Sequence, residues 1–331
     1  MLHSGKRVEE DFLNKISGPL DHYNPDIYYL AGIDSDNQAE LILSAEGSLR
    51  AIPYVEQLID KAPNIEGWQF TALKQPHPNS SIKMGNYEYS AENISFSPLI
   101  DEAYPDEINL VLVHQELNAT NKEELTNGTF IFLDNLLGEL TVACELDYLE
   151  FVGPDQAPEE LIPIEKLPDY LNWRKKEFTE KYEGIRFNTE NDEYMTLEGQ
   201  TGEGAILIAV MNHTLLTWDK KASHPFVFDL ILTYDGSEKN GFPDETIHAD
   251  MNEFEEQIDA ALPDVEGYLN LGRQTGDNNR IIHLCCRDFR KPVLVLDQLL
   301  AINELDAGFN FTYRISKDKY WQAFDRFLPM P

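Results

Sequence analysis

The sequence predicts an α+β fold in which one structural unit occurs twice. Each copy has the expected order β-β-α-β-β-α-β, with two helices on one face of a mixed or antiparallel sheet, a ferredoxin-like sandwich. The main observation is an internal repeat, in which residues 56–68 (EQLIDKAPNIEGW) correspond to residues 256–268 (EQIDAALPDVEGY). A second match joins residues 40–47 to residues 229–236. Repeated segments of this kind indicate a duplicated scaffold.

The matched segments predict a strand, a helix and a second strand in each copy. Residues 40–47 and 229–236 each contain a short apolar run that ends in an acidic residue and glycine, which suits a tight turn. The helix that follows ends before a proline, Pro63 or Pro263, because proline disfavours the α conformation of the residue before it. A Glu-Gly pair then leads into the next strand.

The next two strands are expected to be connected differently in the two copies. In the second copy, residues 268–273 and 280–287 form a predicted hairpin around a Gly-Asp-Asn-Asn turn. In the first copy, strand candidates at 68–74 and 108–114 are separated by an insertion, residues 75–107.

A second helix and a final strand complete each predicted copy. Apolar residues at helical spacing predict a helix across residues 125–136. Residues 133–137 (LDNLL) match residues 296–300 (LDQLL), so a helix is expected there as well. The final strands are predicted at 141–151 and 308–315.

The predicted elements divide the chain into three parts. An N-terminal α+β repeat covers residues 1–152 and includes the insertion 75–107. Residues 153–185 form an acidic, proline-containing linker and a connecting helix, and residues 186–331 form the C-terminal repeat. A length of 331 residues agrees with two domains of about 150 residues each.

The charge of the chain restricts its partners. There are 26 Lys and Arg against 59 Asp and Glu, a net charge of −33, and residues 1–170 alone have 9 against 31. Such a field repels nucleic acid and anionic membranes and accelerates encounter with basic proteins. Solubility is the alternative explanation. Three cysteines, no signal-peptide pattern and no apolar stretch of membrane-spanning length predict a cytoplasmic protein.

Local motifs for catalysis are missing, so no catalytic, cofactor-binding or metal-binding residues are predicted and a non-enzymatic role is favoured. His283 and Cys285 would share one face of a strand, where a metal pair, a nucleophilic pair and buried core residues are the alternatives. The core alternative is preferred, because no second Cys/His pair with matching spacing exists. Adjacent acids such as Glu255 and Glu256 are interpreted as solvated surface.

Basic and aromatic side chains near the C-terminus form the candidate site for an anion or a partner. Its members are Arg273, Arg280, Arg287, Arg290 and Trp321. Arginine binds carboxylates and phosphates in bidentate geometry. Internal ion pairs are the alternative for the arginines. For the tail, residues 319–328, docking as a short helix onto its own domain is the preferred alternative to an exposed recognition stripe.

The C-terminal half resembles a known family. The segment Gly272–Arg280 (GRQTGDNNR), the strand end Cys286-Arg-Asp288 and Asp318-x-x-Trp321 resemble domain of unknown function 695, an uncharacterised bacterial family, over roughly residues 200–329. The N-terminal half resembles the companion domain of that family at Ser44-Ala-Glu-Gly47. The family is distantly similar to the regulator of ribonuclease E activity B. That similarity implies a ferredoxin-like fold and an inhibitory binding role, and it brings no catalytic residues.

Two functional hypotheses follow. The first is a non-enzymatic protein-binding or regulatory module that engages a basic partner protein through its acidic surface. The second is a protein that binds a small molecule or an anion, or an enzyme that acts on one, at the arginine cluster or in a cleft between the repeats. The oligomeric state stays open.

Overall fold

The computed structural model describes residues 12–33, 38–78, 81–303 and 308–328. The chain forms two compact units, residues 1–178 and 179–331. Helix α6 (Leu167–Tyr182) contains the boundary between them. Both units combine helices with β-sheets, so the predicted α+β class is confirmed. No helix in the described part of the chain is long and apolar enough to cross a membrane.

Unit 2 is built on one antiparallel six-stranded sheet with the order β10-β11-β13-β14-β12-β15. The strands are β10 (Tyr194–Gln200), β11 (Ile206–Asn212), β12 (Phe226–Tyr234), β13 (Tyr268–Gly276), β14 (Asn279–Cys286) and β15 (Phe309–Lys317). The helices are α7 (His213–Leu216), α8 (Glu245–Ala261) and α9 (Arg290–Asn303). From β12 to β15 the order is β-α-β-β-α-β, as predicted for residues 229–315.

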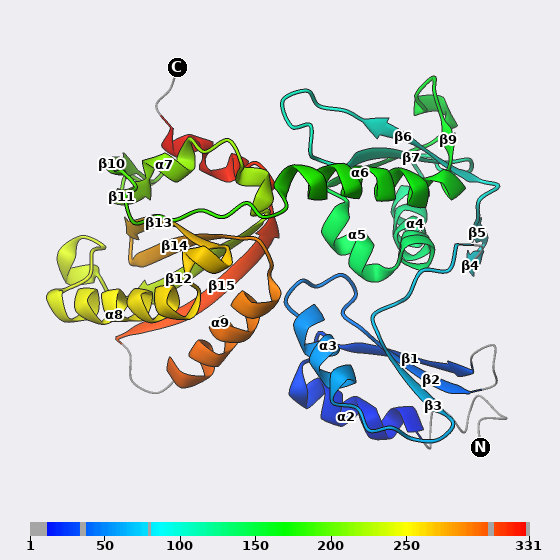
Figure 1. Ribbon diagram of the computed structural model, residues 1–331, viewed down its shortest axis with the longest axis horizontal. Helices are drawn as coiled ribbons and strands as arrows, with labels where there is room; N and C mark the ends of the chain where they lie inside the picture. Colours follow the sequence, from blue (N-terminus) through cyan, green and yellow to red (C-terminus); the bar gives the residue numbers. More distant parts are fainter. Residues whose placement is uncertain (1–11, 34–37, 79–80, 304–307, 329–331) are drawn as a thin grey trace. The chain divides into compact units, whose positions relative to one another are not determined.

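The two faces of this sheet are covered by different elements (Figure 1). Alternation along β12 sends Phe228 and Leu230 toward α8 and α9. Val227 points to the opposite face, where a second core contains Leu215 of α7 and Trp321. That second core is closed by the 3₁₀ helix η7 (Gln322–Phe327) near the C-terminus.

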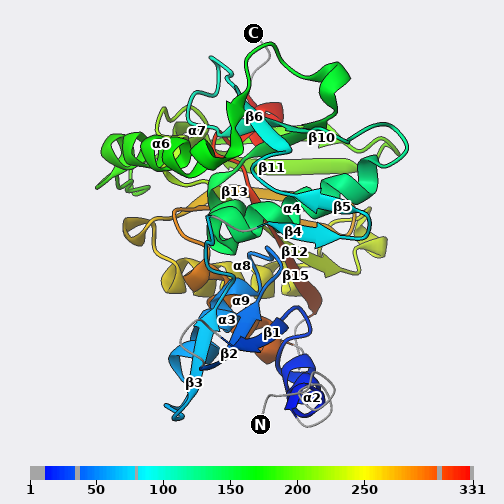
Figure 2. The same ribbon diagram turned by 90° about the vertical axis from the view of Figure 1, so that its right-hand side faces the viewer.

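In its described residues, unit 1 contains three small sheets where unit 2 has a single large one. The first is β1-β2-β3, whose strands lie side by side in Figure 2, the second is the hairpin β4-β5, and the third is β8-β7-β6-β9. The strands are β1 (Tyr28–Ile33), β2 (Ala39–Ser44), β3 (Trp68–Ala72), β4 (Ile82–Met84), β5 (Tyr87–Tyr89), β6 (Ile94–Leu99), β7 (Asn109–His114), β8 (Tyr148–Val152) and β9 (Ile162–Pro163).

The helices of unit 1 divide between these sheets. Helices α2 (Asn14–Tyr23) and α3 (Ile52–Asp60) accompany β1-β2-β3, with Tyr23 packed edge-on against Tyr54. Helices α4 (Lys122–Leu137), α5 (Glu139–Glu145) and α6 accompany the four-stranded sheet. Leu125 and Leu133 of α4 pack with Phe96 and Leu112 of that sheet in one core.

The predicted strand at 141–151 is wrong in its first half. Residues up to Glu145 continue as helix α5, and only Tyr148–Val152 form a strand. The segment is apolar and partly β-branched, which resembles a buried strand, but a turn at Gly138 (φ 83°) starts a new helix. The insertion 75–107 also supplies strands β4, β5 and β6, and β6 pairs with β7.

The repeated segments adopt the same local structure in both units. Residues 56–68 and 256–268 each contain the end of a helix, a glycine at positive φ (Gly67 at 80°, Gly267 at 97°) and the first residue of a strand. The strand pairing differs. In unit 1, β2 and β3 are direct parallel neighbours, whereas β14 separates β12 from β13 in unit 2. A duplication of one complete sandwich is therefore not confirmed.

Candidate functional site

Two of the predicted arginines meet polar side chains of α8 on the helix-covered face of the unit 2 sheet. We call this group the α8 polar cluster; its members are Asn252, Glu255, Asp259, Asn270, Arg273 and Arg280. Arg273 on β13 lies opposite Ile282, and Arg280 on β14 lies opposite Thr275, so both arginines point to the α8 side.

Helix α8 brings its polar residues to the sheet through its spacing. The side chain of Asp244 caps the helix by accepting a hydrogen bond from the Ile247 amide at 2.8 Å. Phe254 and Ile258 are buried against the core. Glu255 comes directly after Phe254, and Asp259 comes directly after Ile258. The two acids are therefore four residues apart and form a row along the flank of the helix.

Hydrogen bonds connect the acids and the bases of the cluster. Arg273 Nη1 forms an ion pair with Glu255 Oε2 at 2.5 Å. Asn270 Nδ2 donates to Asp259 Oδ1 at 3.2 Å and lies 3.4 Å from Glu255 Oε1. Arg280 donates from Nη1 to Asn252 Oδ1 at 2.8 Å and from Nε to Thr275 Oγ1 at 3.3 Å.

The environments of these groups shift their pKa values in opposite directions. Arg280 is only 1% exposed, and burial together with neighbouring Arg273 lowers the pKa of its guanidinium. Burial of the Asp259 carboxyl, with the nearby negative charge of Glu255, raises its pKa to about 6 despite the hydrogen bond from Asn270. The Asp259 residue keeps an exposed surface, so its carboxyl sits at the solvent side of the cluster.

This arrangement is chemically suited to holding a small anion. The two hydrogen bonds of Arg280 described above go to neutral oxygens, and the nearby negative charge of Glu255 is already paired with Arg273. Guanidinium groups bind carboxylates and phosphates strongly when water is excluded. Carboxyl groups with unlike environments, here Glu255 beside Arg273 and Asp259 near solvent, are also the arrangement used for proton transfer.

The other predicted basic residues lie in different contacts. Arg287 donates to the backbone oxygens of Tyr182 at 3.1 Å and Ile185 at 3.0 Å, which fastens the end of α6 to unit 2. Arg290 Nη1 pairs with Asp288 Oδ2 at 2.9 Å. The structure thus brings together only Arg273 and Arg280 of the four arginines.

Trp321 is fully buried, so it offers no exposed surface in this structure. Its Nε1 donates to the His224 backbone oxygen at 2.9 Å, and its ring joins the second core of unit 2. Phe324 and Phe327 are buried beside it. The tail therefore docks onto its own unit as a short helix, which was the preferred alternative for residues 319–328.

His283 and Cys285 of β14 face this second core, whereas Cys286 points to the opposite face of the sheet. His283 Nδ1 lies 2.6 Å from Asp229 Oδ1, and the His283 ring packs edge-on against Phe324. Cys285 and Cys286 are fully buried, and burial raises the pKa of both thiols. A nucleophilic cysteine needs a lowered pKa, so this environment opposes thiolate chemistry. Among the described residues there is no group of three side chains that could hold a metal ion.

The sequence interpretation missed the acidic half of the cluster. Glu255 was expected to be solvated, and it is 8% exposed because it lies between α8 and the sheet. A usable signal was present, since Asn252, Glu255 and Asp259 follow one another at three- and four-residue intervals on the flank of a predicted helix. Which flank faces the arginines depends on the sheet, and the helical spacing does not contain that information.

One of the comparisons with known proteins finds a match. The model of a family of unknown function (DUF695) matches residues 200–329, the segment that contains the α8 polar cluster and Trp321. No curated protein and no solved structure matches the chain.

Proposed function

We propose that the chain is a non-enzymatic binding or regulatory protein of the bacterial cytoplasm that engages a basic partner protein through its acidic surface. The observation that carries this proposal is the charge of residues 1–170, which hold 31 acidic against 9 basic side chains. Exposed acids lie at several places in this region, among them Asp101, Glu102, Glu159 and Glu160. A surface of this charge attracts basic proteins over distances of about a Debye length, near 8 Å at physiological salt.

The sequence resemblance supports the same class of function. Residues 200–329 match a family without a known activity. Its distant similarity to the regulator of ribonuclease E activity B is consistent with a role in binding and inhibiting another protein.

Affinity capture at two salt concentrations tests this proposal. The immobilised chain should retain a basic protein from bacterial lysate at about 50 mM salt and release it at about 500 mM, because salt screens surface charges. Replacing Asp101, Glu102, Glu159 and Glu160 by Asn or Gln should weaken retention. Replacing four exposed acids of unit 2 (Glu203, Glu238, Glu253 and Glu256) by Gln is the matched control. Equal losses in both variants, or no basic protein retained, would contradict the proposal.

A second function, binding of a small anion, is favoured by one feature of the α8 polar cluster. Arg280 is buried, its hydrogen-bond partners Asn252 and Thr275 are neutral, and the nearby Glu255 is shared with Arg273. Such burial is costly for a structural ion and useful for a ligand-binding ion. The ligand would be a carboxylate or phosphate compound, and Glu255 and Asp259 leave an enzymatic role open.

Thermal unfolding with added anions tests the second function. Phosphate or succinate should raise the melting temperature more than chloride at equal ionic strength, because a ligand that binds only the native state stabilises it. Arg273→Gln and Arg280→Gln should abolish this difference, and Arg290→Gln, outside the cluster, should retain it. If all three variants respond like the unmodified chain, the cluster does not bind these anions.

We also propose that the two halves descend from one duplicated ferredoxin-like unit, with a first repeat at 1–152, a linker at 153–185 and a second repeat at 186–331. The support is local. The segments 56–68 and 256–268 have the same helix-turn-strand structure. In the second copy β14 lies between β12 and β13, whereas β2 and β3 pair directly in the first copy. The direct pairing would then be a later change in the first copy.

A further inference from the structure

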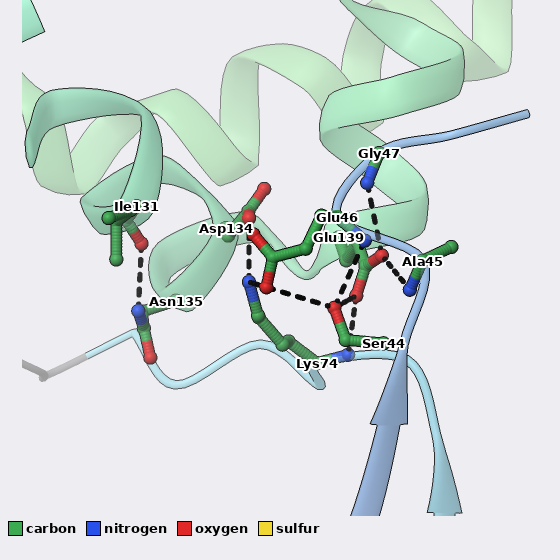
Figure 3. Close-up of polar contacts among 9 residues, drawn as sticks. All are labelled: Ser44, Ala45, Glu46, Gly47, Lys74, Ile131, Asp134, Asn135 and Glu139. Atoms are coloured by element: carbon green, nitrogen blue, oxygen red, sulfur yellow. Dashed lines mark hydrogen bonds and ion pairs between the residues drawn. The ribbon is translucent and has the colours of Figure 1, made fainter. Parts of the chain in front are cut away.

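The strongest polar site outside the α8 polar cluster lies in unit 1, at the ends of β2 and β3. Glu139, the first residue of α5, has no exposed surface. Its carboxylate extends to the turn that follows β2 and to the residues that follow β3 (Figure 3). These two strands are parallel neighbours. In open sheets with parallel strands, ligands bind outside the carboxyl ends of the strands.

Four donors surround this carboxylate. Ser44 Oγ donates to Glu139 Oε2 at 2.8 Å, and the Lys74 amide donates to the same oxygen at 3.1 Å. The amides of Ala45 and Gly47 donate to Oε1 at 2.8 and 3.2 Å. We call Ser44, Ala45, Gly47 and Lys74 the carboxylate cradle.

The backbone of the cradle is preformed by its own turn. Glu46 and Gly47 both have positive φ angles, 48° and 82°, which turn the amides of Ala45 and Gly47 toward one point. Such convergent amides bind anions. A non-glycine residue at positive φ is uncommon and needs support from its surroundings.

A lysine beside the cradle adds positive charge. Lys74 Nζ pairs with Glu46 Oε1 at 3.0 Å and with Asp134 Oδ2 at 3.3 Å (Figure 3). Burial acts to lower the pKa of Lys74, but Glu46, Asp134 and Glu139 raise it above its ordinary value. The ammonium group therefore stays charged next to the bound carboxylate.

The cradle and its occupant belong to different layers of unit 1. The cradle is part of the segment that contains α2, β1, β2, α3 and β3, residues 14–33 and 38–74, which we call the head. Glu139 and Asp134 belong to the α4–α5 layer, whose apolar core is built from residues between Ile82 and Leu171. The contacts described above thus join the head to a core that it does not share.

We infer that the cradle is a carboxylate-binding site whose resident ligand is Glu139, and that this recognition docks the head onto the α4–α5 layer. The ligand of this site is a monocarboxylate, because the four donors bind the two oxygens of a single carboxylate group. This inference is independent of the proposed function.

Glu139→Ala with added carboxylate tests the inference. In this variant, hydrogen exchange of the Ala45, Gly47 and Lys74 amides should accelerate roughly 10- to 100-fold, as expected when hydrogen bonds to a charged group are lost. Acetate or formate should restore protection, and acetamide, a neutral molecule of similar shape, should not. The unmodified chain should not respond to acetate. Glu145→Ala, on the same helix but paired with exposed Lys175, is the control and should leave these amides unchanged.

Two results would overturn the inference. One is a folded Glu139→Ala chain in which the three amides stay protected, or in which acetate and acetamide act alike. The other is loss of protection in β6, β7 and α4 together with the head, because Glu139 would then be a general stability element. The milder variant Ser44→Ala, which removes one donor, should accelerate exchange in the head while these core elements stay protected; the opposite result also counts against a docking role.

Discussion

Individual side chains in the α8 polar cluster show that burial decides the role of a charge. Glu255 and Glu256 are adjacent in sequence, and only Glu255 is buried and paired with an arginine. Asp259 lies one helical turn further, and burial of its carboxyl raises its pKa. Removing a carboxylate can therefore stabilise the protein at one position of this helix and destabilise it at another.

Asp259→Asn should stabilise the protein above pH 6. The pKa of Asp259 is raised from 3.8 to about 6, so its stabilising contribution is complete below about pH 4 and is lost as the pH rises through 6. Asparagine imitates the neutral carboxyl. The gain at pH 8 should be on the order of 1 kcal/mol, less than the full shift implies, because the exposed residue is partly screened by water.

Urea unfolding of both proteins at pH 4.5 and pH 8 measures this difference. The two stabilities should converge at pH 4.5, where Asp259 is largely protonated in the native state. Asp250→Asn, on the exposed side of the same helix, is the control. An Asp259→Asn chain that is less stable at pH 8 would show that the carboxylate is favourable where it lies.

At the scale of elements, close contacts determine how helices and hairpins dock. Tyr89 of the β4-β5 hairpin is fully buried, and its hydroxyl donates to the Glu124 backbone oxygen at 3.3 Å. Its ring lies over Gly128 of α4, where an added Cβ would be 2.0 Å from Tyr89 Cζ. Glycine is unfavourable in the interior of a helix, and its presence here is explained by the close approach of the Tyr89 ring.

Gly128→Ala should destabilise unit 1 by about 2 kcal/mol, although alanine normally favours a helix by about 1 kcal/mol over glycine. Tyr89→Leu removes the clashing ring atoms, so the double variant should lose less than the sum of the two single losses. Gly18→Ala in α2 is the matched control, because an added Cβ there meets no atom within 4 Å. Thermal unfolding measures all four variants, and additive losses would contradict the contact.

Trp321→Phe tests the docking of the tail. The change keeps an aromatic ring and removes the Nε1 donor, which leaves the buried His224 carbonyl without this hydrogen bond. A loss of about 1–3 kcal/mol is expected in urea unfolding. Trp173→Phe, on an exposed position of α6 (55%), should be neutral. Equal effects of the two changes would argue against a specific role for the indole hydrogen bond.

At the scale of the molecule, two units with separate cores share one helix. The boundary after residue 178 lies inside α6, and the last turn of this helix belongs to unit 2. Tyr182 is 4% exposed, and its backbone oxygen accepts a hydrogen bond from Arg287. The sequence placed the start of the second repeat at residue 186, beyond these contacts.

Residues 179–331 should therefore fold alone and should be more stable than residues 186–331. The shorter fragment loses the buried Tyr182 side chain and the backbone oxygens bound by Arg287, which together should cost on the order of 2 kcal/mol. Urea unfolding followed by circular dichroism compares the fragments. Equal stabilities would place the boundary of the folded unit at residue 186.

The elements from β12 to β15 could be predicted from the sequence, but the order of the strands in the sheet could not. The apolar run in 229–236, the stop at Pro263 and the turn near Asp277 are local signals, so strand, helix and hairpin were found where they occur. The α5 helix was missed because its apolar residues suit either structure. Of the candidate site residues, Arg273 and Arg280 were brought together, while the acids between them were taken for surface.

The amino-acid sequence by itself determined the α+β class, the order of elements from β12 to β15 and the repeated helix-turn-strand segments, because these depend on neighbours within a few residues. The tertiary structure alone decided that β2 and β3 pair directly while β12 and β13 do not. It also decided that Glu139 is enclosed by donors more than 60 residues away, with 95 residues separating it from Ser44. The burial and partners of a carboxylate depend on distant segments of the folded chain, and local sequence patterns contain no record of them.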